Sequence, residues 1–299
     1  MTAQGPRHAR SALVSRSRLE ALLGRMIGVR GRDVAIAFRE NGRTIRAVVP
    51  DDALWSGVLF VLLLRAYERS GLRLDDVHGT VLDAGAHAGL FSLSAAAHGN
   101  KVVAVEAHPA MYAMLDANVA SSRMDNIVCL NRAVAGVAGS EVTMSGRDSI
   151  SATITGPLEA GSRVTTVTID ELIASYGPVD LLKMNIEGAE FEAVEAASDG
   201  ALRAIHTLVI ECHGGDVDGI VRRLRGLDFD VAIEMPLFFS WREPVLRVFR
   251  NWRRVRGLAR LKVVAVLMFS AAALVRPFVN IAEAADVDSL RYVFARQRA

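Results

Sequence analysis

The stretch Val81–Leu93, VLDAGAHAGLFSL, decides the fold of this 299-residue chain. An apolar run over 80–85 predicts a buried strand, and small residues over 89–98 predict a helix directly after it. Gly85 allows a tight turn between the two, and Gly89 allows the backbone to approach a ligand closely. The stretch therefore predicts the first strand-turn-helix unit of an α/β domain.

Working outward from this unit, short apolar strands alternate with helices as far as Met235. The predicted strands cover 101–107, 126–131, 141–146, 163–169, 179–185, 206–212 and 228–235, and the predicted helices cover 109–121, 170–176, 188–198 and 216–226. Such alternation is typical of a doubly wound, mostly parallel sheet with helices on both faces. A last strand is expected at 289–297, so we interpret 236–287 as an insertion before it.

Before the alternating region, the sequence predicts a hairpin and a helix. Two alternating runs over 33–49 meet at Asn41-Gly42, which is a strong signal for a two-residue turn. A helix is expected over 53–69, with Asp52 as its N-cap. The resulting segments are an N-terminal basic extension (1–75), a catalytic core (76–235), a helical insertion (236–287) and a last strand (288–299).

The charges are divided unevenly along the chain. Residues 1–46 carry a net charge of +7, residues 47–241 carry −13, and residues 242–299 carry +8. Two basic ends therefore flank an acidic body, and this asymmetry indicates an anionic partner for the ends. The total of +2 conceals this division.

The insertion combines a basic helix with an apolar run. Residues 242–262 place apolar side chains at helical spacing, and 263–275 are apolar throughout; the spaced residues are Val245, Val248, Phe249, Trp252, Val255 and Ala259. As a helix, 263–275 spans about 20 Å, short of the roughly 30 Å of a bilayer core. Two interpretations stay open: 242–275 docks on an anionic membrane or a lipid-linked acceptor, or it forms a lid on the acidic body. Nucleic-acid binding is not expected, because aromatic residues are sparse and no recognition motif occurs.

Composition narrows the class of protein further. Hydrophobic residues make up 51% and charged residues 23%, which excludes a disordered chain. The only two cysteines, Cys129 and Cys212, exclude a disulfide framework and a cysteine zinc cluster, and we expect no metal site. The sequence shows no secretory signal, so we expect a cytoplasmic protein, with attachment to the inner face of the membrane as the alternative.

The turn after the first strand has the features of a cofactor site. Glu106 ends the next strand, where a carboxylate can accept the two hydroxyls of a ribose. The spacing Asp83-x-Gly85-x-x-x-Gly89 lacks the middle glycine of the dinucleotide pattern, and Asp83 suits a cationic ligand better than a pyrophosphate. We therefore predict S-adenosylmethionine as the cofactor, bound by Asp83, Gly85, Ala86, His87, Gly89 and Glu106.

Five motifs occur in an order that resembles a known family. They are VLDAGAHAGLFSL (81–93), VVAVEAHP (102–109), VTTVTIDEL (164–172), DLLKMNIEGAEFEAV (180–194) and LVIECH (208–213). They look like the successive motifs of the FkbM-type S-adenosylmethionine-dependent methyltransferases. The resemblance implies a class I methyltransferase (Rossmann-like) fold and transfer of a methyl group to a hydroxyl oxygen, often on a sugar or polyketide. The family usually has an aspartate at the position of Asn185, so this chain lacks a negative charge there.

The catalytic candidates lie at the ends of two strands. In open parallel sheets, sites lie beyond the carboxyl ends of the strands, where 179–185 delivers Lys183, Asn185 and Glu187 and 206–212 delivers His213. His213 is a candidate general base, and Glu187 either orients it or is itself the base. Structural roles remain open for all of them: a buried Lys183–Glu190 pair, a helix start at Glu187 and a strand end at His213.

We expect an S-adenosylmethionine-dependent O-methyltransferase that acts on a hydroxyl of a glycan, glycolipid or related secondary metabolite. Two alternatives stay open, namely N-methylation on the same fold and a non-catalytic protein that binds the cofactor or a partner. The fold alone does not name the acceptor, because this fold hosts many chemistries.

Overall fold

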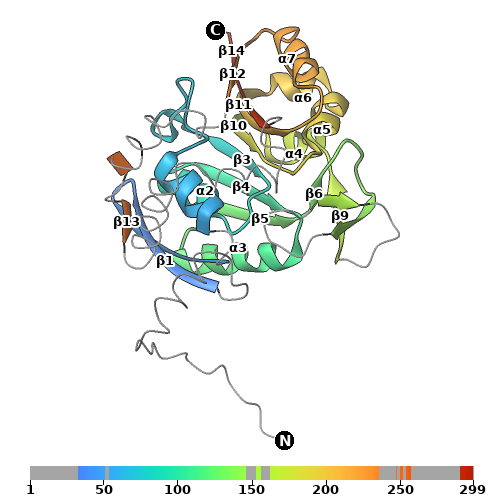
Figure 1. Cartoon of the computed structure of the whole chain (residues 1–299). Helices are drawn as coiled ribbons and strands as arrows, with labels where there is room; N and C mark the ends of the chain where they lie inside the picture. Colours follow the sequence, from blue (N-terminus) through green and yellow to red (C-terminus); the bar gives the residue numbers. More distant parts are fainter. Residues whose placement is uncertain are drawn as a thin grey trace, which may run out of the picture.

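A seven-stranded sheet forms the centre of the described chain (Figure 1). The computed structural model describes residues 33–50, 54–145, 153–155, 162–235, 247, 250–251, 254–256 and 290–298. The strands of the sheet are β3 (Thr80–Ala84), β4 (Lys101–Glu106), β5 (Ile127–Asn131), β10 (Val179–Met184), β11 (Ile205–His213), β12 (Phe229–Glu234) and β14 (Leu290–Gln297). Their order is β12-β14-β11-β10-β3-β4-β5. Only β14 runs antiparallel, against both β11 and β12.

This order confirms the predicted fold class. The chain winds outward from β3 to β5 and then returns to β10 on the other side of β3, which makes the β3/β10 boundary the switch point of the sheet. Ligands of open α/β sheets bind outside the carboxyl ends of the strands at this point. The fold is the class I methyltransferase (Rossmann-like) fold, with the last strand inserted antiparallel.

Helices cover both faces of the sheet (Figure 1). They are α2 (Leu90–Ala97), α3 (Pro109–Ser122), α4 (Ile169–Tyr176), α5 (Glu190–Ala196), α6 (Asp199–Arg203) and α7 (Val217–Arg225). Side chains alternate between two cores, so that Val81 of β3 belongs to one buried cluster and Leu82 to the other. The helices predicted in the alternating region, which correspond to α2, α3, α4, α5 and α7, are confirmed to within two residues at each end, whereas the short α6 was not predicted. In α4, Thr168 and Glu171 form a capping box, which fixes the start of this helix.

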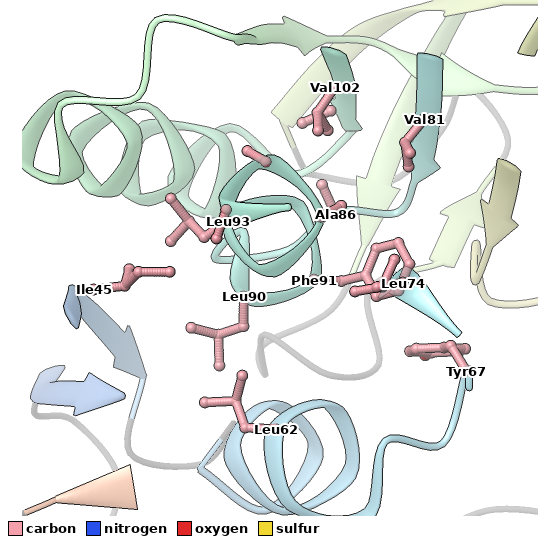
Figure 2. Packing of buried hydrophobic residues seen from close by; sticks show 14 of the residues in the cluster. Ile45, Leu62, Tyr67, Leu74, Val81, Ala86, Leu90, Phe91, Leu93 and Val102 are labelled. Atoms are coloured by element: carbon pink, nitrogen blue, oxygen red, sulfur yellow. The ribbon is translucent and has the colours of Figure 1, made fainter. Parts of the chain in front are cut away.

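The N-terminal hairpin is also confirmed. β1 (Asp33–Glu40) pairs with β2 (Arg43–Pro50) through a two-residue turn, in which Asn41 and Gly42 have φ of 43° and 77°. Ile45 of this hairpin and Leu62 of the following helix pack toward α2 (Figure 2). The hairpin and this helix thus cover one face of the core domain.

The helix after the hairpin is shorter and wider than predicted. It is a π-helix, η1 (Leu54–Leu64), followed after a loop by the short 3-10 helix η2 (Leu74–Asp76). Arg65 adopts a φ of 49°, which ends the helix five residues before the predicted end at residue 69. A left-handed residue cannot continue a right-handed helix.

A small separate sheet accounts for the predicted β-rich stretch. Its order is β6-β9-β7-β8, from β6 (Ala133–Val134), β7 (Glu141–Ser145), β8 (Thr153–Thr155) and β9 (Ser162–Val167). We did not predict β6 and β8, which are only two and three residues long. Periodicity carries little signal over so few residues.

The described part of the insertion docks on the N-terminal hairpin. Val255–Arg256 forms the strand β13, which pairs antiparallel with Ala37 and Phe38 of β1. The helix predicted over 242–262 is therefore wrong at these two residues, because the open edge of β1 offers backbone groups that a strand can satisfy. The apolar run 263–275 and the basic segment 1–32 lie outside the described residues. Among the helices in the described part of the chain, none is long and apolar enough to cross a membrane.

Candidate active site

The turn at Gly85 joins the ends of three strands. Its φ is 76°, and a Cβ atom there would lie 1.7 Å from the backbone oxygen of Asn185, so only glycine fits. The backbone N–H groups of Gly85 and Ala86 both donate to the oxygen of Val105, at 2.9 and 3.0 Å. The turn is therefore held against β10 on one side and β4 on the other.

Gly89 is required for packing. Its φ is 85°, and a Cβ atom would lie 2.5 Å from Cδ1 of Leu115 in α3. His87, in the same turn, has a φ of 52° and donates its backbone N–H to Glu106. The structure thus brings the predicted glycine turn and Glu106 together, and it shows that Gly89 packs directly against α3.

Asp83 and Lys183 form a buried ion pair beneath the turn. Lys183 Nζ lies 2.9 Å from Asp83 Oδ1, and the two side chains are 4% and 0% exposed. Lys183 also donates to the oxygen of Gly85 at 2.7 Å, and Ser92 donates to Asp83 at 2.6 Å. The Lys183–Glu190 pair, one of the structural alternatives, is therefore not formed. Lys183 supports the turn from below, and its charge balances that of Asp83.

Glu106 lies at the carboxyl end of β4 with both oxygens engaged. Oε2 accepts the N–H of His87 and Oε1 accepts the N–H of His108, each at 2.7 Å. Burial outweighs these hydrogen bonds and raises the pKa of Glu106. A carboxylate has about four lone-pair sites, so two remain for the hydroxyls of a ribose.

His213 lies between two glutamates at the ends of β10 and β11. Its Nδ1 lies 3.2 Å from Oε1 of the fully buried Glu190, and its Nε2 lies 3.7 Å from Oε2 of Glu187. Glu190 also accepts the N–H groups of Ile186 and Gly188, each at 2.9 Å. Glu190 therefore shapes the loop that carries Glu187, whose φ of 56° points to a backbone held in place by these contacts.

The environment raises the pKa of both Glu187 and His213. Burial raises the pKa of Glu187 to about 7, against the favourable charge of His213. Burial alone would lower the pKa of His213, but the Glu190 hydrogen bond and the neighbouring glutamate charges raise it to about 9. At neutral pH, His213 is therefore a cation and Glu187 is divided between its two protonation states.

A second cluster on the same face centres on Glu211. Its Oε2 accepts the hydroxyl of Tyr67 at 2.6 Å and the amide of Asn185 at 2.9 Å, and the hydroxyl of Tyr292 also bonds this carboxylate. Its Oε1 lies 4.0 Å from Nε2 of His213, so the two clusters are continuous. Asn185, which lacks the expected charge, thus donates to a carboxylate on the neighbouring strand.

Sequence reasoning missed Glu211, Tyr67 and Tyr292. A signal for Glu211 exists, because it is the only acid in the predicted strand and alternates with His213 onto the same face. Tyr292 lies opposite Glu211 in the ladder of β11 and β14, and Tyr67 follows η1. Neither tyrosine has a sequence signal, since their proximity to Glu211 arises from pairing across more than 80 residues.

The residues present fit S-adenosylmethionine. Oδ1 of Asn185 is buried and lacks a hydrogen-bond partner among the described residues, so it can accept from a donor such as an ammonium group. Glu106, Glu187 and Glu211 make this end of the sheet acidic, which suits a cationic ligand. The unsatisfied oxygen and these carboxylates lie around the Gly85 turn, where the fold places its ligands.

Comparisons with known proteins give the family. The model of the methyltransferase FkbM domain matches residues 83–231, which is about half of the chain. A search of curated protein sequences found no match.

Three solved structures with a similar backbone are distant in sequence. An rRNA methylase from Streptococcus thermophilus has a TM-score of 0.39 and 11% identity, covering 75% of this chain and 92% of its own. An S-adenosylmethionine-dependent methyltransferase from Agrobacterium tumefaciens has a TM-score of 0.38 and 12% identity, covering 69% and 62%. A precorrin-6y C5,15-methyltransferase from Geobacter metallireducens has a TM-score of 0.36 and 12% identity, covering 54% and 70%.

Because these TM-scores are low, the fold assignment rests on the strand order and on the family match. The motifs that carry the resemblance, from Asp83 to the end of β11, lie inside the matched region. Residues 83–231 form a methyltransferase FkbM domain, and through it the chain belongs to the FkbM family of S-adenosylmethionine-dependent methyltransferases.

Proposed function

We propose that this protein transfers a methyl group from S-adenosylmethionine to a hydroxyl oxygen of a glycan, glycolipid or related small molecule. The observation that carries the proposal is the pair Glu187 and His213 at the carboxyl ends of β10 and β11, beside the Gly85 turn. S-adenosylmethionine supplies an electrophilic methyl group on a sulfonium. The protein must align the acceptor with it and remove the hydroxyl proton.

Glu187 is the base in this proposal, and His213 positions it. A base must be unprotonated at the working pH, and the pKa of about 7 keeps a large fraction of Glu187 ionised. The pKa of about 9 leaves His213 protonated at neutral pH, so it holds the Glu187 carboxylate by charge and cannot itself take a proton. Of the two candidate bases predicted from the sequence, Glu187 and His213, this proposal assigns the role to Glu187.

The remaining predicted residues hold the cofactor or support the site. Glu106 has lone pairs for ribose hydroxyls, and Asn185 Oδ1 is a free acceptor at the end of β10. Asp83 and Lys183 fix the turn at Gly85 from beneath. The acidic surroundings of Glu187, Glu190 and Glu211 disfavour phosphorylated acceptors and favour uncharged, hydroxyl-rich ones.

The experiment is a two-stage assay. Calorimetry with S-adenosylmethionine and with S-adenosylhomocysteine tests whether the chain binds the cofactor. A panel of hydroxylated acceptors, with matched amines, is then incubated with methyl-labelled S-adenosylmethionine, and the products are mapped by mass spectrometry. Label on a hydroxyl oxygen supports the proposal, label on nitrogen contradicts the O-specificity, and binding without transfer supports a non-catalytic protein.

Contact of 242–275 with an anionic membrane, one of the two interpretations left open for this segment, is part of this proposal and has its own test. Deleting the segment also removes Arg247 and Arg254, which bind η1 and the hairpin. A deletion therefore cannot separate a loss of membrane binding from a loss of folding. Arg250 is exposed, and Arg250→Glu reverses a charge while leaving these contacts in place. Weaker co-sedimentation of this variant with phosphatidylglycerol vesicles than of the wild type supports the contact, and negligible pelleting of both contradicts it.

A further inference from the structure

The carboxyl end of η1 is closed by a residue of the insertion. The last carbonyls of a helix have no partner within it. Arg247 Nη1 lies 3.2 Å from the oxygen of Leu64, 3.3 Å from that of Arg65 and 3.2 Å from that of Glu68. One cationic side chain, far away in sequence, thus binds three carbonyls where the helix ends.

Tyr67 lies between these three carbonyls in the sequence, and its side chain extends from the same loop into the site. Its hydroxyl lies 2.6 Å from Glu211 Oε2 and 3.0 Å from Asn185 Nδ2. Its ring packs edge-on against Phe91 at 5.6 Å, and Lys183 Nζ lies 5.2 Å from the ring centre. Figure 2 shows Tyr67 directed toward Phe91 from the segment that follows η1.

The insertion is anchored at further points, which restrain the position of Arg247. Arg254 Nη1 lies 2.7 Å from Oε2 of Glu40, a side chain that is 1% exposed. Arg65 pairs with the same carboxylate at 3.2 Å. Asn251 adds a hydrogen bond of 2.9 Å to the oxygen of Leu63. Arg247 is therefore fixed relative to the hairpin on which η1 also packs.

We propose that Arg247 is a positioning residue for methyl transfer, which acts through Tyr67 by holding the chain at Leu64, Arg65 and Glu68. The proposal rests on the proposed function, since Glu211 and Asn185 border the proposed site of transfer. The guanidinium suits this task because its planar fork stays charged and reaches several oxygens at once. Arg247 in this way affects the catalytic end of the sheet through the loop that carries Tyr67.

The first test compares two arginines of the same segment. Arg247→Ala removes the hydrogen bonds to the three carbonyls at the end of η1, whereas Arg250→Ala removes the same charge from an exposed position. We expect Arg247→Ala to lower kcat by about tenfold to a hundredfold, because small misplacements at a site are costly, and to leave the Kd for S-adenosylmethionine unchanged. An equal loss in Arg250→Ala would show that only the charge of the insertion matters and would overturn the proposal.

The second test asks whether Arg247 acts through Tyr67. If it does, Arg247→Ala added to Tyr67→Phe lowers kcat by no more than about twofold beyond Tyr67→Phe alone, since both changes break the same link. Losses that multiply would show independent roles and contradict the proposal.

The third test needs no activity, so it also decides the question if the proposed function fails. Tyr67 and Tyr292 are buried against Glu211, which raises the pKa of both well above the ordinary value. In a spectrophotometric titration to about pH 11, we expect one more of the four tyrosines to ionise in Arg247→Ala than in the wild type. The gain should be absent in Arg250→Ala and in Arg247→Ala/Tyr67→Phe. No gain in Arg247→Ala would show that Arg247 does not hold Tyr67.

Discussion

The amide nitrogen of Asn185 lies 2.9 Å from Oε2 of Glu211 and donates a hydrogen bond to it. Both side chains lie at the carboxyl ends of adjacent parallel strands, β10 and β11. The missing charge at position 185 thus avoids placing two carboxylates in contact, where each would disfavour ionisation of the other. The pair also keeps Glu211 available to the hydroxyls of Tyr67 and Tyr292.

Asn185→Asp should therefore lower the stability of the folded protein. The new carboxylate would face Glu211 and lose a donor, which costs on the order of 1–3 kcal/mol of unfolding free energy. Urea denaturation and the methyl-transfer assay measure the two effects. The exchange variant Asn185→Asp/Glu211→Gln restores one amide and one carboxylate, and we expect it to recover most of the stability. Higher activity in Asn185→Asp alone would contradict the finding that the pair is matched.

Glu187→Gln should abolish most of the transfer. Removing a general base costs about a hundredfold to ten-thousandfold in kcat. In the wild type, kcat/KM should fall as the pH drops below the Glu187 pKa of about 7, because protonation removes the base, and this acid limb should be lost in the variant. Glu195→Gln, an exposed change on the following helix, is the control. An acid limb that persists in Glu187→Gln would assign the base to another group.

Gly85→Ala should unfold or strongly destabilise the domain. The added Cβ would lie 1.7 Å from the backbone oxygen of Asn185, and neither strand end can move without breaking the turn. Gly99→Ala is the matched control, because Gly99 also has a positive φ but has open space around its Cβ position. We expect about 1 kcal/mol for Gly99→Ala from backbone strain alone and at least about 3 kcal/mol for Gly85→Ala. Chemical denaturation monitored by circular dichroism gives both values, and equal losses would contradict the close contact.

His213 should stabilise the fold in a pH-dependent way. Burial opposes its charge, but Glu190 and the neighbouring carboxylates raise its pKa from 6.5 to about 9. A raised folded-state pKa gives stability that is complete below the unfolded value and lost as the pH rises through the folded value. The difference in unfolding free energy between wild type and His213→Gln should therefore shrink by roughly 2–3 kcal/mol between about pH 6 and pH 10. Urea denaturation at both pH values checks this, and a constant difference would show that these partners do not raise the pKa of His213 in the folded protein.

Much of the catalytic core could be predicted from the sequence because its signals are local. The strand-turn-helix at Gly85, the alternation from β3 to β12 and the hairpin turn at Asn41-Gly42 each lie within a few consecutive residues. Burial on both faces of a parallel sheet leaves a continuous apolar run, and a two-residue turn needs residues that tolerate positive φ. The same logic placed Glu106, Glu187 and His213 at one end of the sheet.

The fold class and the strand ends at which the candidate residues lie were thus determined by the sequence alone, since periodicity and strand-end positions are properties of short segments. The family followed from the sequence motifs between 83 and 231. Tertiary structure alone decided the partners: Lys183 with Asp83, Asn185 with Glu211, and Arg247 with the carbonyls of Arg65 and Glu68 about 180 residues away. It also turned Val255–Arg256 from an expected helix into a strand on β1. A charge or hydrogen bond is satisfied by whichever group the folded chain brings within about 3 Å, and that distance is set by packing between segments remote in sequence.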